Sequence, residues 1–312
     1  MRAFTLDSFD DAPGLRDDVP APHPGDTDLL VRVQSSSVNP VDAAIAGGLL
    51  RERFEHEFPV LLGRDYAGAV EEVGSGVTRY GVGDEVYGFV PHANPTVHAG
   101  SWAELIVLPE DNHVAASPAG EELREAGAAP LAGITALACV DALDVSEGDT
   151  VLVVGATGGV GHFAVQLLTH AGAIVIAPAL PDDEVFLRGV GVSELVERGG
   201  DVAAEVFDRH PDGLDGLIDV VSYSPDEFNA NAAVLKEGGR AATPLSAAGE
   251  GPGRTNAMAV PSSENLDRFA TLLSAGTIKA YVEDSYALDQ AGEAMNALGA
   301  THTQGKLGLA VS

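Results

Sequence analysis

A glycine-rich hexapeptide in the middle of the chain has the composition of a turn that binds phosphate groups. Its residues are Ala156, Thr157, Gly158, Gly159, Val160 and Gly161. The spacing A-x-G-x-x-G matches the dinucleotide fingerprint, with alanine in place of the first glycine. Gly158 would let the backbone approach a pyrophosphate, and Gly161 would let a helix pack closely on the preceding strand. The N–H groups at the start of that helix would attract the anion.

Two elements must hold this turn in place, and the sequence predicts both. The segment 150–154, TVLVV, is apolar throughout, as is typical of a strand buried on both faces. After the turn, apolar residues recur with helical spacing. They are Val160, Phe163, Ala164, Leu167, Leu168 and Ala171. Because strand, turn and helix occur together, the sequence favours a dinucleotide site over a tight turn that binds no ligand.

The choice of dinucleotide depends on the end of the next predicted strand, AIVIAPAL at 173–180. An NAD site wants a carboxylate there for the ribose 2′-hydroxyl, but the strand ends in Ala179 and Leu180. An NADP site wants a cation or hydroxyl for the 2′-phosphate, and the acidic residues at 182–184 would repel that group. Arg188 either reaches back to the phosphate or is an exposed helical arginine. The residues therefore leave NADPH and NADH open.

The flanking sequence indicates an α/β fold. Residues 1–118 contain short apolar runs separated by Gly, Pro and Asp, which is typical of a strand-rich domain. From 121 onward the chain is rich in Ala and Leu, and predicted strands and helices then alternate. Such alternation predicts βαβ units in a doubly wound parallel sheet, the Rossmann arrangement, with helices on both faces.

Composition excludes several classes of partner. The 312 residues carry a formal net charge of −30, which repels nucleic acids and anionic membranes. No apolar run reaches the roughly 18 residues of a membrane helix, and the acidic start has no apolar signal core. Cys139 is the single cysteine, so neither an intrachain disulfide nor a four-cysteine zinc lobe can form. We expect a soluble cytoplasmic protein whose acidity reflects either adaptation to high salt or a GC-rich genome.

The chain as a whole resembles a known family. The motifs that carry the resemblance are, in chain order, SSVNPVDAAIAGG, PVLLGRDYAGAVEEVGSGV, GSWAELIVLP, APLAGITALACVDAL, EGDTVLVVGATGGVG, GLDGLIDVV, LKEGGR and QGKLGLAV. On these motifs the chain resembles the zinc-free quinone oxidoreductase branch of the medium-chain dehydrogenase/reductase superfamily. The resemblance implies a GroES-like, β-rich catalytic domain at 1–118 plus 262–312, with a Rossmann dinucleotide-binding domain inserted at 119–261. We also expect a homodimer.

The resemblance raises the question of zinc. Zinc-dependent alcohol dehydrogenases of the superfamily hold a catalytic metal at three positions, which here carry Asn39, Arg64 and, near the third, Gly133. None of these residues replaces cysteine or histidine as a ligand. The nine histidines, His92 and His98 among them, are scattered without ligand spacing, so we expect no metal site. Without a Lewis acid to polarise an alcohol, hydride delivery to an already electron-poor acceptor is favoured.

The resemblance also implies roles for individual residues. Asn39, in the Asn-Pro-x-Asp loop, would donate a hydrogen bond to substrate or cofactor, and Thr135 would contact the cofactor. Residues that follow two later predicted strands would line the nicotinamide. They are Val221, Ser222 and Leu245. Asp42 is expected to cap or bind its own loop rather than to act in catalysis.

One departure from the family concerns the proton donor. Many relatives carry tyrosines in the loop after Asn-Pro-x-Asp, where this chain has Ala44 and Leu50. Tyr66 is either close to the substrate or part of the core. A quinone can take its proton from water, whereas protonation of an enone carbon by water is harder to control. The small-molecule electron acceptor is therefore a quinone or an α,β-unsaturated carbonyl, and the missing tyrosines favour the quinone.

Three functions stay open at this point. The first is an NADPH-dependent quinone or enone reductase that works without zinc, with NADH as the alternative cofactor. The second is a zinc-free enoyl-thioester reductase. The third is a nucleotide-binding redox sensor or scaffold without turnover. Oxidation of reduced cofactor by a simple quinone separates the first from the third, and activity on a crotonyl thioester alone would favour the second.

Overall fold

The chain folds into two compact units. The computed structural model describes residues 1–53, 55–90, 100–300 and 302–312. Unit 1 comprises Met1–Leu131, Val260–Gly276 and Ala280–Ser312, and unit 2 comprises Ala132–Ala259 and Thr277–Lys279. The first division therefore follows Leu131, whereas the change of sequence texture put the expected boundary after residue 118.

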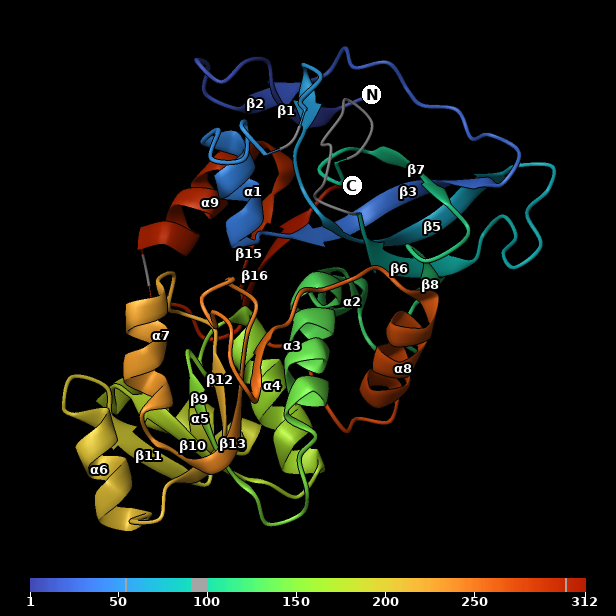
Figure 1. Cartoon of the computed structure of the whole chain (residues 1–312). Helices are drawn as coiled ribbons and strands as arrows, with labels where there is room; N and C mark the ends of the chain where they lie inside the picture. The colour runs from blue at the N-terminus through green and yellow to red at the C-terminus, as the bar shows by residue number, and fades with distance from the viewer. Residues whose placement is uncertain (54, 91–99, 301) are drawn as a thin grey trace. The chain divides into compact units, whose positions relative to one another are not determined.

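Unit 2 is built on a six-stranded sheet in the order β11-β10-β9-β12-β13-β14, with parallel pairings throughout (Figure 1). The strands are β9 (Thr150–Val154), β10 (Ile174–Ala179), β11 (Glu194–Glu197), β12 (Leu214–Asp219), β13 (Leu235–Thr243) and β14 (Arg254–Asn256). The strand order runs outward from β9 in one direction and then restarts beside it with β12. This arrangement confirms the doubly wound Rossmann sheet, and the apolar centre of β9 is fully buried as expected.

Helices return the chain between consecutive strands of this sheet. They are α4 (Gly159–His170), α5 (Glu184–Val190), α6 (Val202–Arg209) and α7 (Pro225–Ala232), with the short 3-10 turn η1 (Pro181–Asp183) before α5. A further helix, α3 (Pro130–Leu143), begins in unit 1 and continues in unit 2. Because the strands are parallel, each connection leads from the carboxyl end of one strand to the amino end of the next. The loops that follow the strands therefore gather at one edge of the sheet.

Unit 1 is rich in β structure and mostly antiparallel. Its main sheet has the order β15-β16-β3-β5-β6-β8, with β7 also paired to β3, and a small sheet has the order β2-β1-β4. The strands are β1 (Ala3–Leu6), β2 (Gly14–Arg16), β3 (Asp28–Ser37), β4 (Val60–Leu61), β5 (Asp65–Val73), β6 (Glu85–Phe89), β7 (Leu105–Pro109), β8 (Ala115–Ala116), β15 (Val282–Ala287) and β16 (Lys306–Ala310). The helices are α1 (Pro40–Ala46), α2 (Leu123–Ala128), α8 (Ser263–Ser274) and α9 (Ala291–Ala300), with the 3-10 turn η2 (Leu288–Gln290).

The two ends of the chain meet in this main sheet. Strand β16 pairs antiparallel with the end of β3, and the pair is visible in Figure 1 as a red strand beside a blue one. The N–H of Val38, just after β3, donates to the carbonyl of Leu307 at 3.0 Å. This pairing sets the first residue of β16, Lys306, beside the loop that begins α1.

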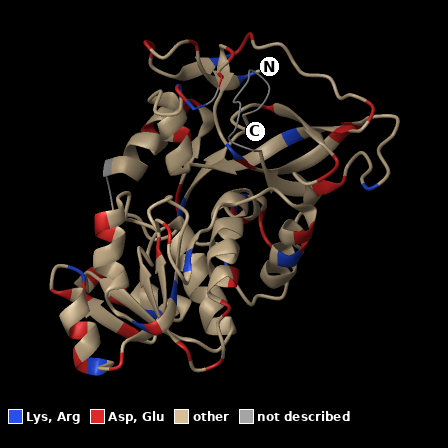
Figure 2. Cartoon of the chain, viewed as in Figure 1, with Lys and Arg blue, Asp and Glu red and all other residues tan. Residues whose placement is uncertain are grey.

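Apolar residues fill the interior of each unit, and acidic residues dominate the charge. In unit 1 the core includes the fully buried Trp102, Tyr66 and Ile45, and in unit 2 it includes Phe228 and Leu217. Figure 2 shows Asp and Glu distributed over both units, in keeping with 47 acidic against 17 basic residues. In the part of the chain that the structure describes, no helix is long and apolar enough to span a membrane.

Candidate functional site

The carboxyl edge of the unit 2 sheet brings together residues from four neighbouring strands. β10, β9, β12 and β13 lie side by side and parallel, so their carboxyl ends meet at this edge. The expected cofactor-binding residues follow these strands. They are Ala179 and Leu180 at the end of β10, Ala156 to Gly161 after β9, Val221 and Ser222 after β12, and Leu245 after β13. In an open parallel sheet, ligands bind at the point where the strand order reverses, and here that point lies between β9 and β12.

The glycine turn after β9 contains one glycine that the sequence analysis did not assign. Gly155 has φ +89°, and a Cβ there would lie 2.7 Å from the Cγ2 atoms of Val220 and Val221. A residue with a side chain would be strained in this left-handed conformation and would also clash. Gly155 therefore makes the tight turn. The expectation that Ala156 replaces the first glycine of the fingerprint is wrong. The spacing is G-x-x-G-x-x-G, and the signal was a glycine directly after an apolar strand.

Two later glycines of the turn face different surroundings. A Cβ on Gly161 would lie 2.0 Å from the carbonyl oxygen of Gly155 and 2.7 Å from the Cα of Ala156. A Cβ on Gly158 would meet a single heavy atom within 4 Å, the Gly155 oxygen at 3.6 Å. Gly161 is thus required by the packing of α4 on the turn. Gly158 faces open space on its own chain, which is room for a bound group.

The N-terminus of α4 offers donors to such a group. Gly158 is the N-cap residue of this 12-residue helix, and no side chain among the described residues caps it. The first N–H groups of an α-helix have no partner within the helix, and the helix dipole adds partial positive charge there. The turn and the helix together therefore have the geometry that binds phosphate.

The contacts of Arg188 decide between its two alternatives and show an exposed arginine on helix α5. The Arg188 guanidinium donates to the carbonyls of Val192 and Ser193, which precede β11. β10 and β11 are parallel, so this position is at the amino edge of the sheet, opposite to the end of β10. Arg188 therefore does not reach back toward Ala179. The reason is the direction of α5, which carries its last turn away from the carboxyl edge.

Another arginine, which the sequence analysis missed, lies at the carboxyl edge. Arg198 directly follows β11, and its backbone N–H donates to the carbonyl of Ala179 at 3.1 Å. Of the acidic run beside it, Asp183 is buried, and its carboxylate accepts a hydrogen bond from the Leu180 N–H at 2.9 Å. The carboxylate of Asp183, one of the three acidic residues, therefore bonds to the backbone. Arg198, a cationic residue, lies beside the end of β10.

A buried carboxylate organises the loop after β12. Asp219 is 0% exposed and accepts hydrogen bonds from the N–H groups of Val221 and Ser222, both at 2.9 Å. It also accepts from the Ser222 hydroxyl at 2.7 Å and from Asn231 at 2.8 Å. The Ser222 hydroxyl therefore bonds inward, while the Val221 side chain stays 47% exposed. Asp219 and Asn231 are positioning residues that the sequence analysis did not name.

Leu245 and Thr135 are the two remaining residues of unit 2 that were expected to contact the cofactor. After β13, the N–H of Leu245 donates to the Thr243 hydroxyl at 3.1 Å, and the Leu245 side chain is half-buried. Thr135 lies on α3 and is 7% exposed. Its contact with the cofactor stays a prediction.

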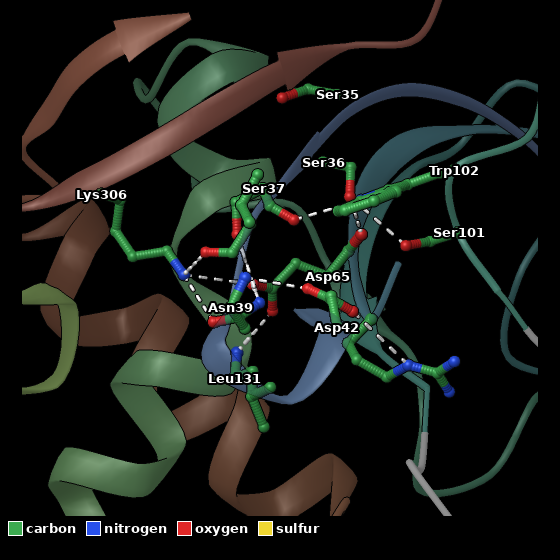
Figure 3. A network of polar contacts seen from close by, with 12 residues as sticks. Ser35, Ser36, Ser37, Asn39, Asp42, Asp65, Ser101, Trp102, Leu131 and Lys306 are labelled. Atoms are coloured by element: carbon green, nitrogen blue, oxygen red, sulfur yellow. Dashed lines mark hydrogen bonds and ion pairs between the residues drawn. The ribbon is translucent and has the colours of Figure 1, made fainter. Parts of the chain in front are cut away.

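In unit 1, Asn39 belongs to a buried polar network centred on Asp65 (Figure 3). Its amide donates to Asp65 Oδ2 at 2.7 Å, and its Oδ1 accepts from Lys306 Nζ at 2.6 Å. Asp65 also accepts from the Ser37 hydroxyl at 2.6 Å and, through Oδ1, from the Leu131 N–H at 2.7 Å. The role of Asn39 toward substrate or cofactor stays a prediction, since its strong bonds here run to neighbours inside unit 1.

The second half of this network is a buried ion pair. Asp42 Oδ2 accepts from the Asn39 N–H at 2.8 Å, which confirms the expected capping role at the start of α1. Its Oδ1 lies 3.8 Å from Nε of Arg64, and both side chains are 0% exposed. Burial raises the pKa of Asp42 to about 7, against the opposing effect of the Arg64 charge. Burial likewise lowers the pKa of Arg64 and of Lys306.

The donor set of this region does not fit zinc. Among the residues that the structure describes, no three His, Cys, Asp or Glu side chains are grouped as metal ligands. Arg64 has no lone pair to offer, and the amide of Asn39 is already bonded to Asp65 and Lys306. His92 and His98 lie outside the described residues.

Tyr66 is a core residue and not a proton donor. Its side chain is 0% exposed, and its hydroxyl donates to the carbonyl of His113 at 2.7 Å. Burial raises the pKa of this phenol well above its usual value. The alternative that placed Tyr66 in the core is therefore correct.

Two family descriptions match parts of the chain. The alcohol dehydrogenase GroES-like domain matches residues 25–119, and the zinc-binding dehydrogenase domain matches residues 190–308. Together they cover segments of both units, and the first contains Asn39, Arg64 and Asp65.

Relatives match along nearly the whole chain. A chloroplast envelope quinone oxidoreductase homolog of Arabidopsis thaliana is 29% identical over 93% of this chain and 91% of its own length. A 2-methylene-furan-3-one reductase of Solanum lycopersicum is 29% identical over 98% of this chain and 78% of its own length. The solved structure of the quinone oxidoreductase from Coxiella burnetii is 26% identical, with a TM-score of 0.86 over 100% of this chain and 99% of that one.

Proposed function

The chain belongs to the medium-chain dehydrogenase/reductase superfamily, and we propose that this oxidoreductase transfers a hydride from NADPH to a quinone or an α,β-unsaturated carbonyl without zinc. The observation that carries the proposal is the carboxyl edge of the unit 2 sheet. A helix N-terminus that no described side chain caps, an open glycine and the ends of four parallel strands meet there. A dinucleotide is long enough to contact all of them.

The residues of this edge would divide the work of binding. The turn at Gly158 and the first N–H groups of α4 would hold the pyrophosphate. Val221 would give an apolar contact on a loop whose backbone N–H groups bond to Asp219. The bound cofactor would supply the hydride, while the protein supplies orientation and excludes water.

The preference for NADPH is supported by the end of β10. A carboxylate for the ribose hydroxyl of NADH is not found at Ala179 or Leu180, and the nearby Asp183 is bonded to a backbone N–H. Arg198 beside Ala179 would attract the 2′-phosphate of NADPH. Asp182 and Glu184 oppose it, so we propose a preference of tenfold or less, on the order of 1.4 kcal/mol.

The choice of acceptor follows from the chemistry of unit 1. Arg64 and Asn39 stand at ligand positions of the zinc-dependent relatives, and neither is a zinc ligand in this geometry. Without zinc to polarise an alcohol, an acceptor must be electron-poor by itself. With Tyr66 in the core and no tyrosine at positions 44 and 50, water is the proton source, which favours a quinone over an enone.

A panel of acceptors tests this proposal. Purified protein is mixed with NADPH or NADH and with phenanthrenequinone, simple quinones, linear enones or a crotonyl thioester, and oxidation of the cofactor is followed. We expect turnover with quinones and weaker turnover with enones. Turnover on the thioester alone would favour the enoyl-thioester reductase, and tight cofactor binding without any turnover would favour a redox sensor or scaffold.

A further inference from the structure

Four charged side chains lie buried in one network of unit 1 and balance one another. They are Asp42, Arg64 and Asp65, each 0% exposed, and Lys306, which is 4% exposed. Two are acidic and two are basic, so their formal charges sum to zero. An isolated charge in a protein interior is strongly unfavourable, and each buried charge therefore needs a counter-charge nearby.

The four charged side chains form two ion pairs, and the loop before α1 contacts both pairs. Lys306 Nζ lies 3.6 Å from Asp65 Oδ2, and Arg64 Nε lies 3.8 Å from Asp42 Oδ1. Asn39 connects the pairs, since its side-chain amide bonds to Asp65 and its backbone N–H bonds to Asp42. Figure 3 shows Lys306, Asn39 and Asp65 directed toward one another.

Two of the three positions that the family resemblance assigns to zinc ligands, Arg64 and Asn39, each involve a fixed cation here. At one position the residue is itself a cation, Arg64, which has donors but no acceptor. At the other position the one acceptor atom of the Asn39 side chain, Oδ1, is 2.6 Å from the ammonium of Lys306. A metal ion at this place would meet like charges, and the acceptor atom that Asn39 offers already binds an ammonium.

We propose that Arg64 and Lys306 are a built-in replacement for a metal ion. As fixed cations they neutralise the two buried carboxylates, and Lys306 also holds the amide of Asn39 in one orientation. This inference rests on the zinc-independent reaction proposed above. It extends that reaction, because it says which side chains carry the charge of the missing metal.

A double-mutant cycle on Lys306 and Asp65 tests the charge balance. Lys306→Met and Asp65→Asn each leave one buried charge unpaired, whereas the double variant removes the pair. We expect each single change to lower the midpoint of thermal unfolding by roughly 6–20 °C, and the double variant to lose less than the sum. Lys279→Met is the matched control, since Lys279 is exposed in unit 2, and its midpoint should not move.

The cycle stays decisive if a single variant does not fold. A double variant that folds where Lys306→Met does not would support the proposal. Single changes without effect, or a double variant that loses the full sum, would overturn it.

A metal-loading experiment addresses the replacement itself. Wild-type protein is incubated with zinc, freed of excess metal by gel filtration, and analysed for metal content and unfolding midpoint. We expect far less than one zinc per chain and an unchanged midpoint. One tightly held zinc per chain, lost in Asp65→Asn, would contradict the proposal.

These readouts separate the inference from the proposed function. If no acceptor is reduced while the cycle and the metal content come out as expected, the proposed reaction is wrong and the charge replacement stands. If zinc binds in stoichiometric amount while quinone reduction continues in a chelator, the replacement is wrong and the reaction stands.

Discussion

The carboxyl edge of unit 2 and the buried network of unit 1 differ in how their charges are paired. At the carboxyl edge, α4 begins without a side-chain cap among the described residues, and Gly158 faces open space. In the network, two carboxylates lie beside two cations of the same chain. The first region keeps its positive potential for an external anion, whereas the second cancels its charges internally. The difference supports the proposal that the reaction depends on a bound dinucleotide and not on a bound metal.

The largest effect is expected from replacing a glycine of the turn after β9 with valine. The same substitution at Gly161 and at Gly158 should have different consequences. Gly161→Val should prevent unit 2 from folding, because even a Cβ there lies 2.0 Å from the Gly155 oxygen, and that oxygen belongs to the backbone. The measurement is soluble yield together with circular dichroism. Wild-type stability in this variant would show that α4 does not pack on the turn as described.

The next largest expected effect is a loss of folding stability when Asp42 ionises. Its pKa is raised by burial from 3.8 to about 7, so between these values the unfolded chain releases a proton that the native chain retains. Stability should therefore be lost as pH rises through this window and level off above it, by up to about 4 kcal/mol. Groups that face Asp42 are Arg64, Asp65, Lys306 and the Asn39 N–H.

Asp42→Asn isolates this contribution, because its amide oxygen can still accept from the Asn39 N–H. Urea unfolding at several pH values should show that the variant gains stability relative to wild type as pH rises from about 4 to about 7. Parallel curves for the two proteins would contradict the raised pKa.

Gly158→Val should damage binding and leave the fold intact. The N-cap backbone has φ −75° and ψ 179°, which any residue adopts, and the Cβ meets no close neighbour. A branched side chain there would occupy the space of the pyrophosphate, and we expect a loss of about 3 kcal/mol, or roughly a hundredfold in Kd. Calorimetric titration with NADPH measures this loss, and circular dichroism should show that Gly158→Val folds whereas Gly161→Val does not. An unchanged Kd in the folded variant would place the phosphate elsewhere.

The smallest expected effect separates two arginines. Arg198→Gln should reduce the NADPH preference by up to about tenfold in kcat/KM, which is about 1.4 kcal/mol. Arg188→Gln should not change it, because that guanidinium bonds to carbonyls at the opposite edge of the sheet. The cofactor ratio is measured at low and high salt, since screening weakens the effect of Asp182 and Glu184. A loss of preference in Arg188→Gln alone would reverse the assignment.

Sequence patterns located the carboxyl edge because its information is local. The turn, its strand and its helix are contiguous, and parallel strands place the later loops at the same edge. A pattern does not hold two details: the backbone conformation of Gly155, which was missed, and the direction of α5, which decides between the alternatives for Arg188. Arg198 was missed because it neighbours Ala179 through strand pairing.

The buried network was less accessible to sequence analysis. Lys306 and Asn39 are 267 residues apart, and their contact exists only because β16 pairs with β3. Nothing in the motif QGKLGLAV indicates a buried lysine, since a lysine at a strand end is usually exposed. The expected absence of zinc ligands at Asn39 and Arg64 was visible in the sequence, but the counter-charges that stand there were not.

One measurement tests the central claim most directly: oxidation of NADPH by phenanthrenequinone, followed in the presence and absence of excess chelator on protein freed of metal. The account predicts turnover that depends on the protein, is unchanged by the chelator and, at an NADPH concentration near the wild-type Kd, is strongly reduced in Gly158→Val. Loss of turnover in the chelator, with recovery on addition of zinc, would contradict it.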